Sequence, residues 1–348
     1  MKTLKAGIIG FGKMGRIRKK VLDKRPDTEV VIVCESNYKR RFKSRACLFT
    51  NDQEEVFAED LDLLFVCTPN FLIKDLVVRA LNQKIHVFAE KPPGLSYAQV
   101  EEMQQALKRN PGQKLKFGFN HRYHQAVIEL KKQVDSGKFG KIIWLRGRYG
   151  KSVDETFFDN WRSKKELAGG GILMDQGIHM LDLFLHLCGD FEEVKSFCSN
   201  GYWNLDIEDN AFVIMKNSSG QQASLHSTMT QWRHLFALEV FLERGYMVIN
   251  GFNTPSKTYG GECLSIALNR DEIPRATHTM EENLLYKSDH SWELEIDEFT
   301  SAVKKNSPII NGNIKDALKI MNLIERIYAD GKAEPLTDQS YLNLKVKS

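Results

Sequence analysis

The first 120 residues of the 348-residue chain alternate short apolar segments with segments of helical periodicity. The apolar segments, such as LDLLFVCTP at 61–69, show no polar alternation across their centres. Strands of this kind are buried on both faces, which is typical of a parallel sheet covered by helices on both sides. We therefore predict an α/β domain with a doubly wound parallel sheet over residues 1–120. Its expected strands are 6–12, 29–35, 61–69, 85–92 and 114–120, with helices at 13–24, 72–83 and 97–109.

Residues 121–348 follow a different pattern, in which one hairpin-like segment follows another without helices between them. The turns at Ser219-Gly220 and Arg244-Gly245 each separate two strand-like segments, which indicates a largely antiparallel sheet. No linker rich in Gly, Ser or Pro follows residue 120, so we expect a second, α+β domain that packs firmly on the first and leaves a crevice between them. Helices are expected at 123–135, 293–305 and 315–329.

The composition excludes several classes of function. A net charge of +4, from 49 basic and 45 acidic residues, is too balanced for a nucleic-acid binder. No uncharged apolar stretch is long enough to span a membrane, and the early glycine turn leaves no room for a signal peptide. The six cysteines lack the pairing of a zinc site and are interpreted as free thiols in a reducing compartment. These observations predict a cytoplasmic protein without a metal site.

A glycine-rich turn, GFGKMG, directly follows the first expected strand. In this spacing Gly10 permits a tight turn, Gly12 lets the backbone approach a pyrophosphate, and Gly15 lets helix pack on strand. The helix then offers free N–H groups to the phosphates. Glu35 ends the second strand twenty positions after Gly15, where a carboxylate accepts hydrogen bonds from a ribose. The expected cofactor contacts in this region are Gly10, Phe11, Gly12, Lys13, Met14, Gly15 and Glu35.

The identity of the dinucleotide is less constrained. Glu35 should repel the 2′-phosphate of NADP and so favours NAD. Lys39, Arg40 and Arg41 follow closely and could hold such a phosphate, or they could simply coat an exposed helix. We expect NAD, with NADP as the alternative.

Two further segments carry groups suited to chemistry. AEKPPG (89–94) places Lys91 at the carboxyl edge of the parallel sheet, where its ammonium could stabilise a developing alkoxide. In GGGILMDQGIHMLD (169–182), Asp175, His179 and Asp182 share one stripe of a helix, which His186 extends. The alternatives are a surface lysine at a turn and a solvated helix face.

GIIGFGKMG, CTPN, EKPPG, GFNHRY and GGGILMDQGIHMLD, in this order and spacing, resemble the glucose–fructose oxidoreductase / inositol dehydrogenase (Gfo/Idh/MocA) family over nearly the whole chain. The resemblance implies an N-terminal Rossmann domain (1–120) and a C-terminal domain (121–348) with an open antiparallel sheet that often forms a homodimer or homotetramer. It also implies NAD(P)-dependent oxidation or reduction of a sugar, sugar nucleotide or cyclitol. Several short motifs look most like members linked to surface polysaccharides.

The resemblance also implies roles for single residues. Lys91 matches the family's catalytic lysine, and Asp175 and His179 match its D-x-x-x-H pair, which would place the polar stripe at the nicotinamide and substrate. In this reading His179, with a pKa near 6.5, exchanges the substrate proton while Asp175 orients its ring or a substrate hydroxyl. Ile73 departs from the family's pattern, since many members have histidine there. Residues expected near the cofactor are Thr68, Pro69, Asn70, Glu90, Lys91, Asn120 and Arg122.

Aromatic and basic residues of the second half could line a sugar pocket, because aromatic faces stack on pyranose rings and arginines bind pyrophosphates. The substrate candidates are Tyr149, Trp161, Arg162, Trp232 and Arg233, with Lys151 beside them. Taken alone, each is more typical of ordinary packing or an interface. We expect Asp182 to be structural, tying its helix to neighbouring backbone, and His186 to be a helix-face residue. Two other functions remain open: a non-enzymatic dinucleotide-sensing regulator, and an NAD-dependent glycosidase or dehydratase that uses hydride transiently.

Overall fold

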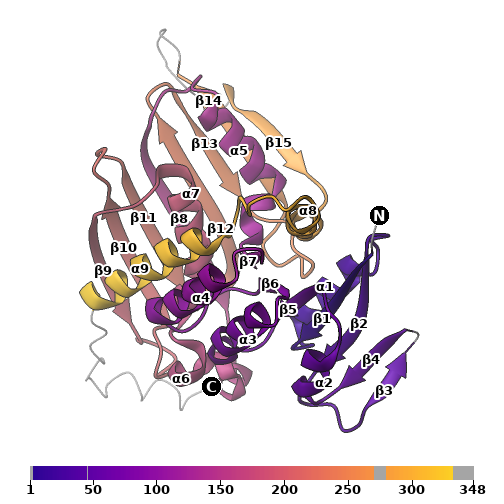
Figure 1. Ribbon diagram of the computed structural model, residues 1–348. Coiled ribbons are helices and arrows are strands. Elements are labelled where there is room, and N and C mark those ends of the chain that lie inside the picture. Colours follow the sequence, from indigo (N-terminus) through magenta and orange to yellow (C-terminus); the bar gives the residue numbers. More distant parts are fainter. Residues whose placement is uncertain (1–2, 45, 270–279, 332–348) are drawn as a thin grey trace.

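The computed structural model describes residues 3–44, 46–269 and 280–331, which form two sheets and their helices (Figure 1). In this part of the chain the first sheet has seven strands in the order β3-β4-β2-β1-β5-β6-β7. Every neighbouring pair is parallel except β3–β4 at the edge. The predicted doubly wound parallel sheet is therefore confirmed. Its strands are β1 (Leu4–Ile9), β2 (Thr28–Cys34), β3 (Phe42–Ser44), β4 (Cys47–Thr50), β5 (Leu63–Val66), β6 (His86–Ala89) and β7 (Leu115–Phe117).

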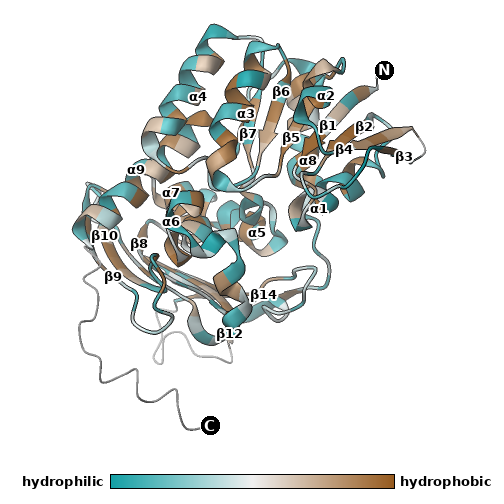
Figure 2. Ribbon diagram, turned by 90° about the horizontal axis from the view of Figure 1, so that it is seen from below, coloured by the Kyte–Doolittle hydropathy of each residue, from teal (hydrophilic) through white to brown (hydrophobic). Residues whose placement is uncertain are grey.

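Helices cover both faces of this sheet, which is why its strands are apolar on both sides. The helices of the first half are α1 (Lys13–Leu22), α2 (Gln53–Ala58), α3 (Asn70–Asn82) and α4 (Tyr97–Arg109). α2, α3 and α4 pack on one face, and α1 packs on the other. In Figure 2 the strands are largely hydrophobic, whereas the helices beside them carry both colours.

The segment between β2 and β5 differs from the expectation. The sequence pattern did not indicate β3, β4 or α2, which are short elements at the edge of the sheet. Lys39, Arg40 and Arg41 lie in a bend that leads into β3, so the interpretation that they coat an exposed helix is wrong. These elements are too short to show a reliable sequence period, so the pattern could not distinguish helix from strand here.

The second sheet has eight strands within the described residues, in the order β15-β14-β13-β12-β8-β11-β10-β9. Only the β8–β11 pair is parallel there, and the expected hairpins at Ser219-Gly220 and Arg244-Gly245 are β10–β11 and β12–β13. The largely antiparallel sheet is thus confirmed. Its strands are β8 (Ile142–Ser152), β9 (Glu193–Ser199), β10 (Asn210–Lys216), β11 (Gln222–Thr228), β12 (Thr230–Leu242), β13 (Gly245–Asn250), β14 (Glu262–Leu268) and β15 (Glu282–Tyr286).

Helices cover one face of the second sheet, and the other, which we call the open face, carries no helix from the described part of the chain. α5 (Gln125–Asp135), α7 (Ile178–Cys188) and α9 (Ile314–Asp330) pack on the covered face (Figure 1). No helix among the described residues is long and apolar enough to span a bilayer. All six cysteines are free thiols. Large apolar side chains exposed on strands of this sheet include Ile143, Phe197, Phe212, Ile214 and Leu285.

The two halves share part of their core. After β7 the chain passes through a short 3-10 helix, Asn120–Tyr123, into α5. α8 (Ser291–Lys305) then returns to the first sheet, where Ile296 and Phe299 pack with the side chains of β1, β5 and β6. A boundary near residue 120 therefore marks where the chain changes sheets, while α8 joins both halves into one packed unit.

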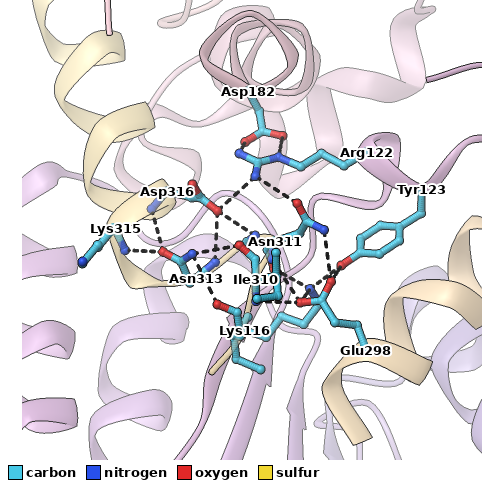
Figure 3. Close-up of polar contacts among 12 residues, drawn as sticks. Lys116, Arg122, Tyr123, Asp182, Glu298, Ile310, Asn311, Asn313, Lys315 and Asp316 are labelled. Carbon is cyan, nitrogen blue, oxygen red and sulfur yellow. Dashed lines mark hydrogen bonds and ion pairs between the residues drawn. The ribbon is translucent and has the colours of Figure 1, made fainter. Parts of the chain in front are cut away.

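Buried ion pairs fix α7 against the segment that joins the halves (Figure 3). The guanidinium of Arg122 donates to both carboxylate oxygens of Asp182 on α7, at 2.8 and 2.6 Å, and lies 3.1 Å from Asp316 on α9. Lys116 is fully buried and donates to the hydroxyl of Tyr123 at 2.7 Å. Asp182 is thus structural, as expected, although its partner is a side chain rather than backbone.

Replacing Asp182 should destabilise the fold strongly. Asp182→Asn leaves the buried Arg122 charge with Asp316 as its one remaining carboxylate partner among the described residues, so we expect a loss of about 3 kcal/mol in the free energy of unfolding, measured by chemical denaturation. Asp135→Asn is the matched control, because it breaks the exposed pair with Lys131 and should cost less than about 1 kcal/mol. Equal losses in the two variants would contradict the assigned role.

Candidate active site

The three glycines of the first turn are required for different reasons. Gly10 has φ of +88°, and a Cβ there would lie 2.5 Å from the carbonyl oxygen of Cys67. A Cβ on Gly15 would lie 2.1 Å from the carbonyl oxygen of Gly10, so helix α1 could not approach β1. A Cβ on Gly12 would meet nothing within 4 Å. Gly10 and Gly15 therefore build the turn, while Gly12 leaves its backbone open toward solvent.

A cavity of about 660 Å³ runs along this turn and the carboxyl ends of the first sheet. Its lining includes most of the residues that the sequence predicts near a cofactor. Glu35 is held at the cavity by accepting the backbone N–H of Phe11 at 2.7 Å. The predicted residues that line the cavity are Gly10, Gly12, Lys13, Met14, Glu35, Thr68, Pro69, Asn70, Glu90, Lys91, Trp161 and Arg162.

Other predicted residues lie away from this cavity. Gly15 packs inside the turn. Arg122 was expected near a nicotinamide, but its guanidinium belongs to the buried ion-pair network with Asp182. Asn120 donates to the hydroxyl of Ser291 at 3.2 Å. Trp232 is 57% exposed and packs against the ring of Tyr202 at 4.9 Å. Arg233 is exposed beside Trp232.

The end of the cavity beyond the carboxyl end of β2 is acidic. Glu35 and Asp52 both line it, together with Ser36 and Asn37, and Lys39, Arg40 and Arg41 are absent from its described lining. Arg41 instead pairs with Glu55, 3.2 Å away. These residues fit a nucleotide with a free ribose diol, because carboxylates accept hydrogen bonds from hydroxyls and repel a phosphate.

The three glycines at 169–171 allow the helix that carries Asp175 to begin where other segments of the chain lie very close to its backbone. A Cβ on Gly170 would lie 2.1 Å from the Tyr328 hydroxyl, and one on Gly171 would lie 2.0 Å from the carbonyl oxygen of Glu208. The buried carboxylate of Glu208 accepts the N–H groups of Gly171 and Leu173 at 2.8 and 2.9 Å, and the Tyr328 hydroxyl at 2.9 Å. Glu208 thereby fixes the start of the helix.

The sequence pattern predicts a regular α-helix over this segment, but the structure departs from it. Leu173–Gly177 forms a π-helical turn before α7, a local irregularity often found at functional sites. Lys91 reaches this turn from the end of β6, and its ammonium donates to the backbone oxygen of Asp175 at 2.5 Å and to its carboxylate at 3.1 Å. Lys151, from β8, donates to the other carboxylate oxygen at 2.7 Å. Neither a surface lysine nor a solvated face describes this arrangement.

The charges of this cluster act on the pKa values of Asp175 and Lys91. Burial would raise the pKa of Asp175, but the ammonium groups of Lys151 and Lys91 and the guanidinium of Arg162, 3.7 Å away, hold it well below its usual range. Burial lowers the pKa of Lys91 despite the attraction of Asp175. Asp175 is therefore ionised, and Lys91 releases its proton more readily than an exposed lysine.

The imidazole ring of His179 stacks on that of His121. Its ring faces that of His121 with centroids 3.8 Å apart and planes inclined by 16°. His121 also bonds the hydroxyl of Tyr149 at 2.9 Å, so Tyr149 supports the stack from behind. The Nδ1 atom of His179 is buried without a hydrogen-bond partner among the described residues. A group that enters the site would be the natural partner of this atom.

The environment of His179 changes two expectations. Burial and the nearby Lys91 ammonium lower its pKa well below the expected value of 6.5, so its ring is neutral at physiological pH. Both carboxylate oxygens of Asp175 are bonded to lysines, so Asp175 orients Lys91 and Lys151 rather than the imidazole. His121 was not among the expected site residues; its place within GFNHRY, between two residues that were expected there, was the available signal.

Two family models match this chain, and both describe domains of the same family. A model described as "Oxidoreductase family, NAD-binding Rossmann fold" matches residues 4–119, and one described as "GFO/IDH/MocA C-terminal domain" matches residues 127–248. The chain belongs to the Gfo/Idh/MocA family. The assignment made from its motifs is confirmed.

Two curated relatives come from Escherichia coli (strain K12). D-glucoside 3-dehydrogenase is 31% identical over 207 residues, which are 57% of this chain and 58% of the relative. 2,7-anhydro-N-acetylneuraminate hydratase is 26% identical over 254 residues, which are 70% of this chain and 64% of the relative. These alignments thus span less than two thirds of either relative.

Among solved structures, levoglucosan dehydrogenase in complex with NADH superimposes with a TM-score of 0.83 at 19% identity. The match covers 95% of this chain and 97% of that one. At this identity the likeness establishes the Gfo/Idh/MocA fold over the described chain, and the site residues themselves must be argued from the geometry above.

Substitution of Gly12 should separate cofactor binding from folding. Gly12→Ala has space for its methyl group in the free protein, so the melting temperature should stay close to that of wild type. The methyl group would occupy the place where the backbone approaches a pyrophosphate, so NADH affinity, followed by fluorescence, should fall about tenfold or more. Unchanged NADH binding would show that the cavity at the glycine turn does not hold the cofactor.

Proposed function

We propose that this protein is an NAD-dependent oxidoreductase that transfers hydride between nicotinamide and a hydroxyl or keto carbon of a sugar-type substrate. One observation carries the proposal: Lys91, which lines the cavity that begins at the glycine turn, donates a hydrogen bond to Asp175 from the second half, and its ammonium lies close enough to the buried ring of His179 to lower that residue's pKa. The family and its sugar-oxidising relatives support the same reaction class.

The reaction removes a hydride from the substrate carbon and a proton from its hydroxyl group, leaving a carbonyl. Bound NAD⁺ supplies the hydride acceptor. Lys91 donates a hydrogen bond to the reacting oxygen and favours its anionic form, while Asp175 holds the ammonium in place. His179 is neutral and has an unpartnered Nδ1 atom, so it can accept the proton.

NAD rather than NADP is the proposed cofactor. Glu35 and Asp52, at the acidic end of the cavity, would repel a 2′-phosphate. The basic residues at 39–41 do not line the cavity and so do not offset that repulsion. Burial of a ribose diol against Glu35 would instead satisfy the carboxylate. The link to surface polysaccharides stays a prediction from the sequence.

A reaction that uses hydride only transiently is the second candidate, and the similarity to a hydratase favours it. Both reactions need the same lysine, carboxylate and imidazole, but they differ in net cofactor reduction. Accumulation of NADH in step with product supports the net oxidoreductase; sustained conversion without NADH supports the transient reaction. The Lys91–Asp175–Lys151 cluster argues against a purely regulatory protein, which would need no such charges.

We also propose that the open face of the second sheet joins two or more copies of the chain. Phe197 and Phe212 are partners in neighbouring strands and are 82% and 49% exposed. Ile214 lies two residues further along the same strand and is 64% exposed. An apolar face of this kind is typical of a protein–protein contact. Light scattering of the purified protein tests for a homodimer or homotetramer.

Loss of Lys91 or His179 should reduce turnover without loss of cofactor binding. We expect Lys91→Ala and His179→Ala to lower kcat by about 10²- to 10⁴-fold in NADH-producing assays with a screened sugar substrate. The dissociation constant of NADH should remain near that of wild type. Lys131→Ala, on the exposed side of α5, is the control. A rate that survives either active-site change would remove that residue from the mechanism.

The oxidation rate should depend on pH in a defined way. Because the pKa of His179 lies well below 6.5, its ring stays neutral as the pH falls from 8 to 6, and kcat/KM should not decline there. Because the pKa of Lys91 is lowered from 10.5, the ammonium is lost earlier on the alkaline side, and the rate should fall before pH 10.5. A single acid limb centred near 6.5 would contradict this assignment.

A further inference from the structure

His179 lacks the hydrogen bond that usually orients a catalytic imidazole. In most active sites one ring nitrogen of such a histidine bonds a carboxylate or a backbone carbonyl, which fixes the ring and its tautomer. Within the described residues neither ring nitrogen of His179 has such a bond. The carboxylate of Asp175, one turn earlier, is occupied by the ammonium groups of Lys91 and Lys151. A different contact therefore has to hold the ring of His179.

Other aromatic rings provide that contact. His121, from the 3-10 helix Asn120–Tyr123, lies face to face with His179 at a centroid distance of 3.8 Å. The ring of Phe119 is nearly perpendicular to that of His179, with centroids 6.5 Å apart. A parallel ring on the face and a perpendicular ring beside it restrict the plane of the imidazole. Both nitrogen atoms of His179 stay available for other partners.

Hydrogen bonds at both of its nitrogens hold the His121 ring in place. Its Nε2 atom lies 2.9 Å from the hydroxyl of Tyr149, and its Nδ1 atom lies 3.2 Å from the side-chain oxygen of Asn120. The amide nitrogen of Asn120 donates to the hydroxyl of Ser291 at 3.2 Å, so the amide oxygen faces His121. Nδ1 of His121 therefore donates to Asn120, and Nε2 accepts from Tyr149.

The surroundings of His121 also keep its ring uncharged. Burial, followed by the charges of His179, His124 and Lys91, lowers the pKa of His121 well below its usual range. When His179 accepts a proton it becomes a cation 3.8 Å from the centre of this ring. A second cation at that distance would oppose the transfer, whereas the face of a neutral aromatic ring attracts the charge.

We propose that His121 is a positioning residue for His179: its neutral ring fixes the plane of the catalytic imidazole and stabilises the imidazolium that forms when the substrate proton is transferred. The proposal rests on the function proposed above, in which His179 accepts that proton. It also gives Tyr149 a different role from the sugar contact expected from the sequence. Tyr149 is only 5% exposed and does not line the large cavity, and its hydroxyl holds His121.

Two substitutions at position 121 test whether an aromatic face is required. His121→Phe keeps such a face, and His121→Leu removes it. Both are made together with Tyr149→Phe, which takes away a hydroxyl that would otherwise be buried without a partner. We expect kcat for sugar oxidation to be about tenfold lower with leucine than with phenylalanine. The dissociation constant of NADH should be the same in both. His290→Leu is the control, because this histidine is exposed.

A double-mutant cycle tests whether the effect passes through His179. In a His179→Ala background the residual turnover should be equal with phenylalanine and leucine at position 121, because no imidazole is left to position. Tyr149→Phe alone keeps both imidazole rings and serves if the leucine variant does not fold. It should lower kcat when His179 is present and have no effect when His179 is alanine.

Two results would overturn the proposal. One is equal kcat for the phenylalanine and leucine variants, or for Tyr149→Phe and wild type, when His179 is present. The other is the same loss in the His179→Ala background, which would show that His121 acts independently of His179. Failure of the proposed function gives a different result, since wild-type protein would then produce no NADH from any screened sugar.

Discussion

The contact between Lys91 and Asp175 determines how the two halves of this protein form one site. Lys91 lies two residues after the end of β6, and Asp175 lies in the π-helical turn before α7. Both groups are largely buried, and a buried charge is stable only when it is paired and hydrogen-bonded. The ammonium of Lys91 therefore donates to both the backbone oxygen and the carboxylate of Asp175. This pair of contacts holds a residue of the second half against the cavity-lining lysine of the first.

A second set of buried charges supports the segment that carries Lys91. The guanidinium of Arg18 lies 2.7 Å from Glu90 and 2.7 Å from Glu295 on α8, between the rings of Phe88 and Trp292. Burial raises the pKa of Glu295 to about 7 despite this cation. Arg18 thus ties the helix after the glycine turn, the segment before Lys91 and a helix from the other half into one structure. Glu90 is therefore held in place, and Lys91, the next residue, extends from a rigid backbone.

Much of the fold was predictable because its signals are local. Uniformly apolar strands, two glycine-containing hairpins and the spacing of Gly10, Gly12 and Gly15 each reflect a backbone or burial requirement that acts within a few residues. Lys91 was also predictable, since the end of a parallel strand defines where a side chain can act. The edge strands β3 and β4 gave no such signal, because they are too short for a periodic pattern.

The sequence by itself determined the two sheets, the nucleotide turn and the residue types that its chemistry requires. Only the tertiary structure decided which of those residues meet. It brought Lys151 and Arg162 to Asp175, stacked His121 on His179, and moved Arg122 into a buried network away from the cavity. These contacts join segments far apart in the chain, and charges interact strongly only at short range, so no local pattern could encode them.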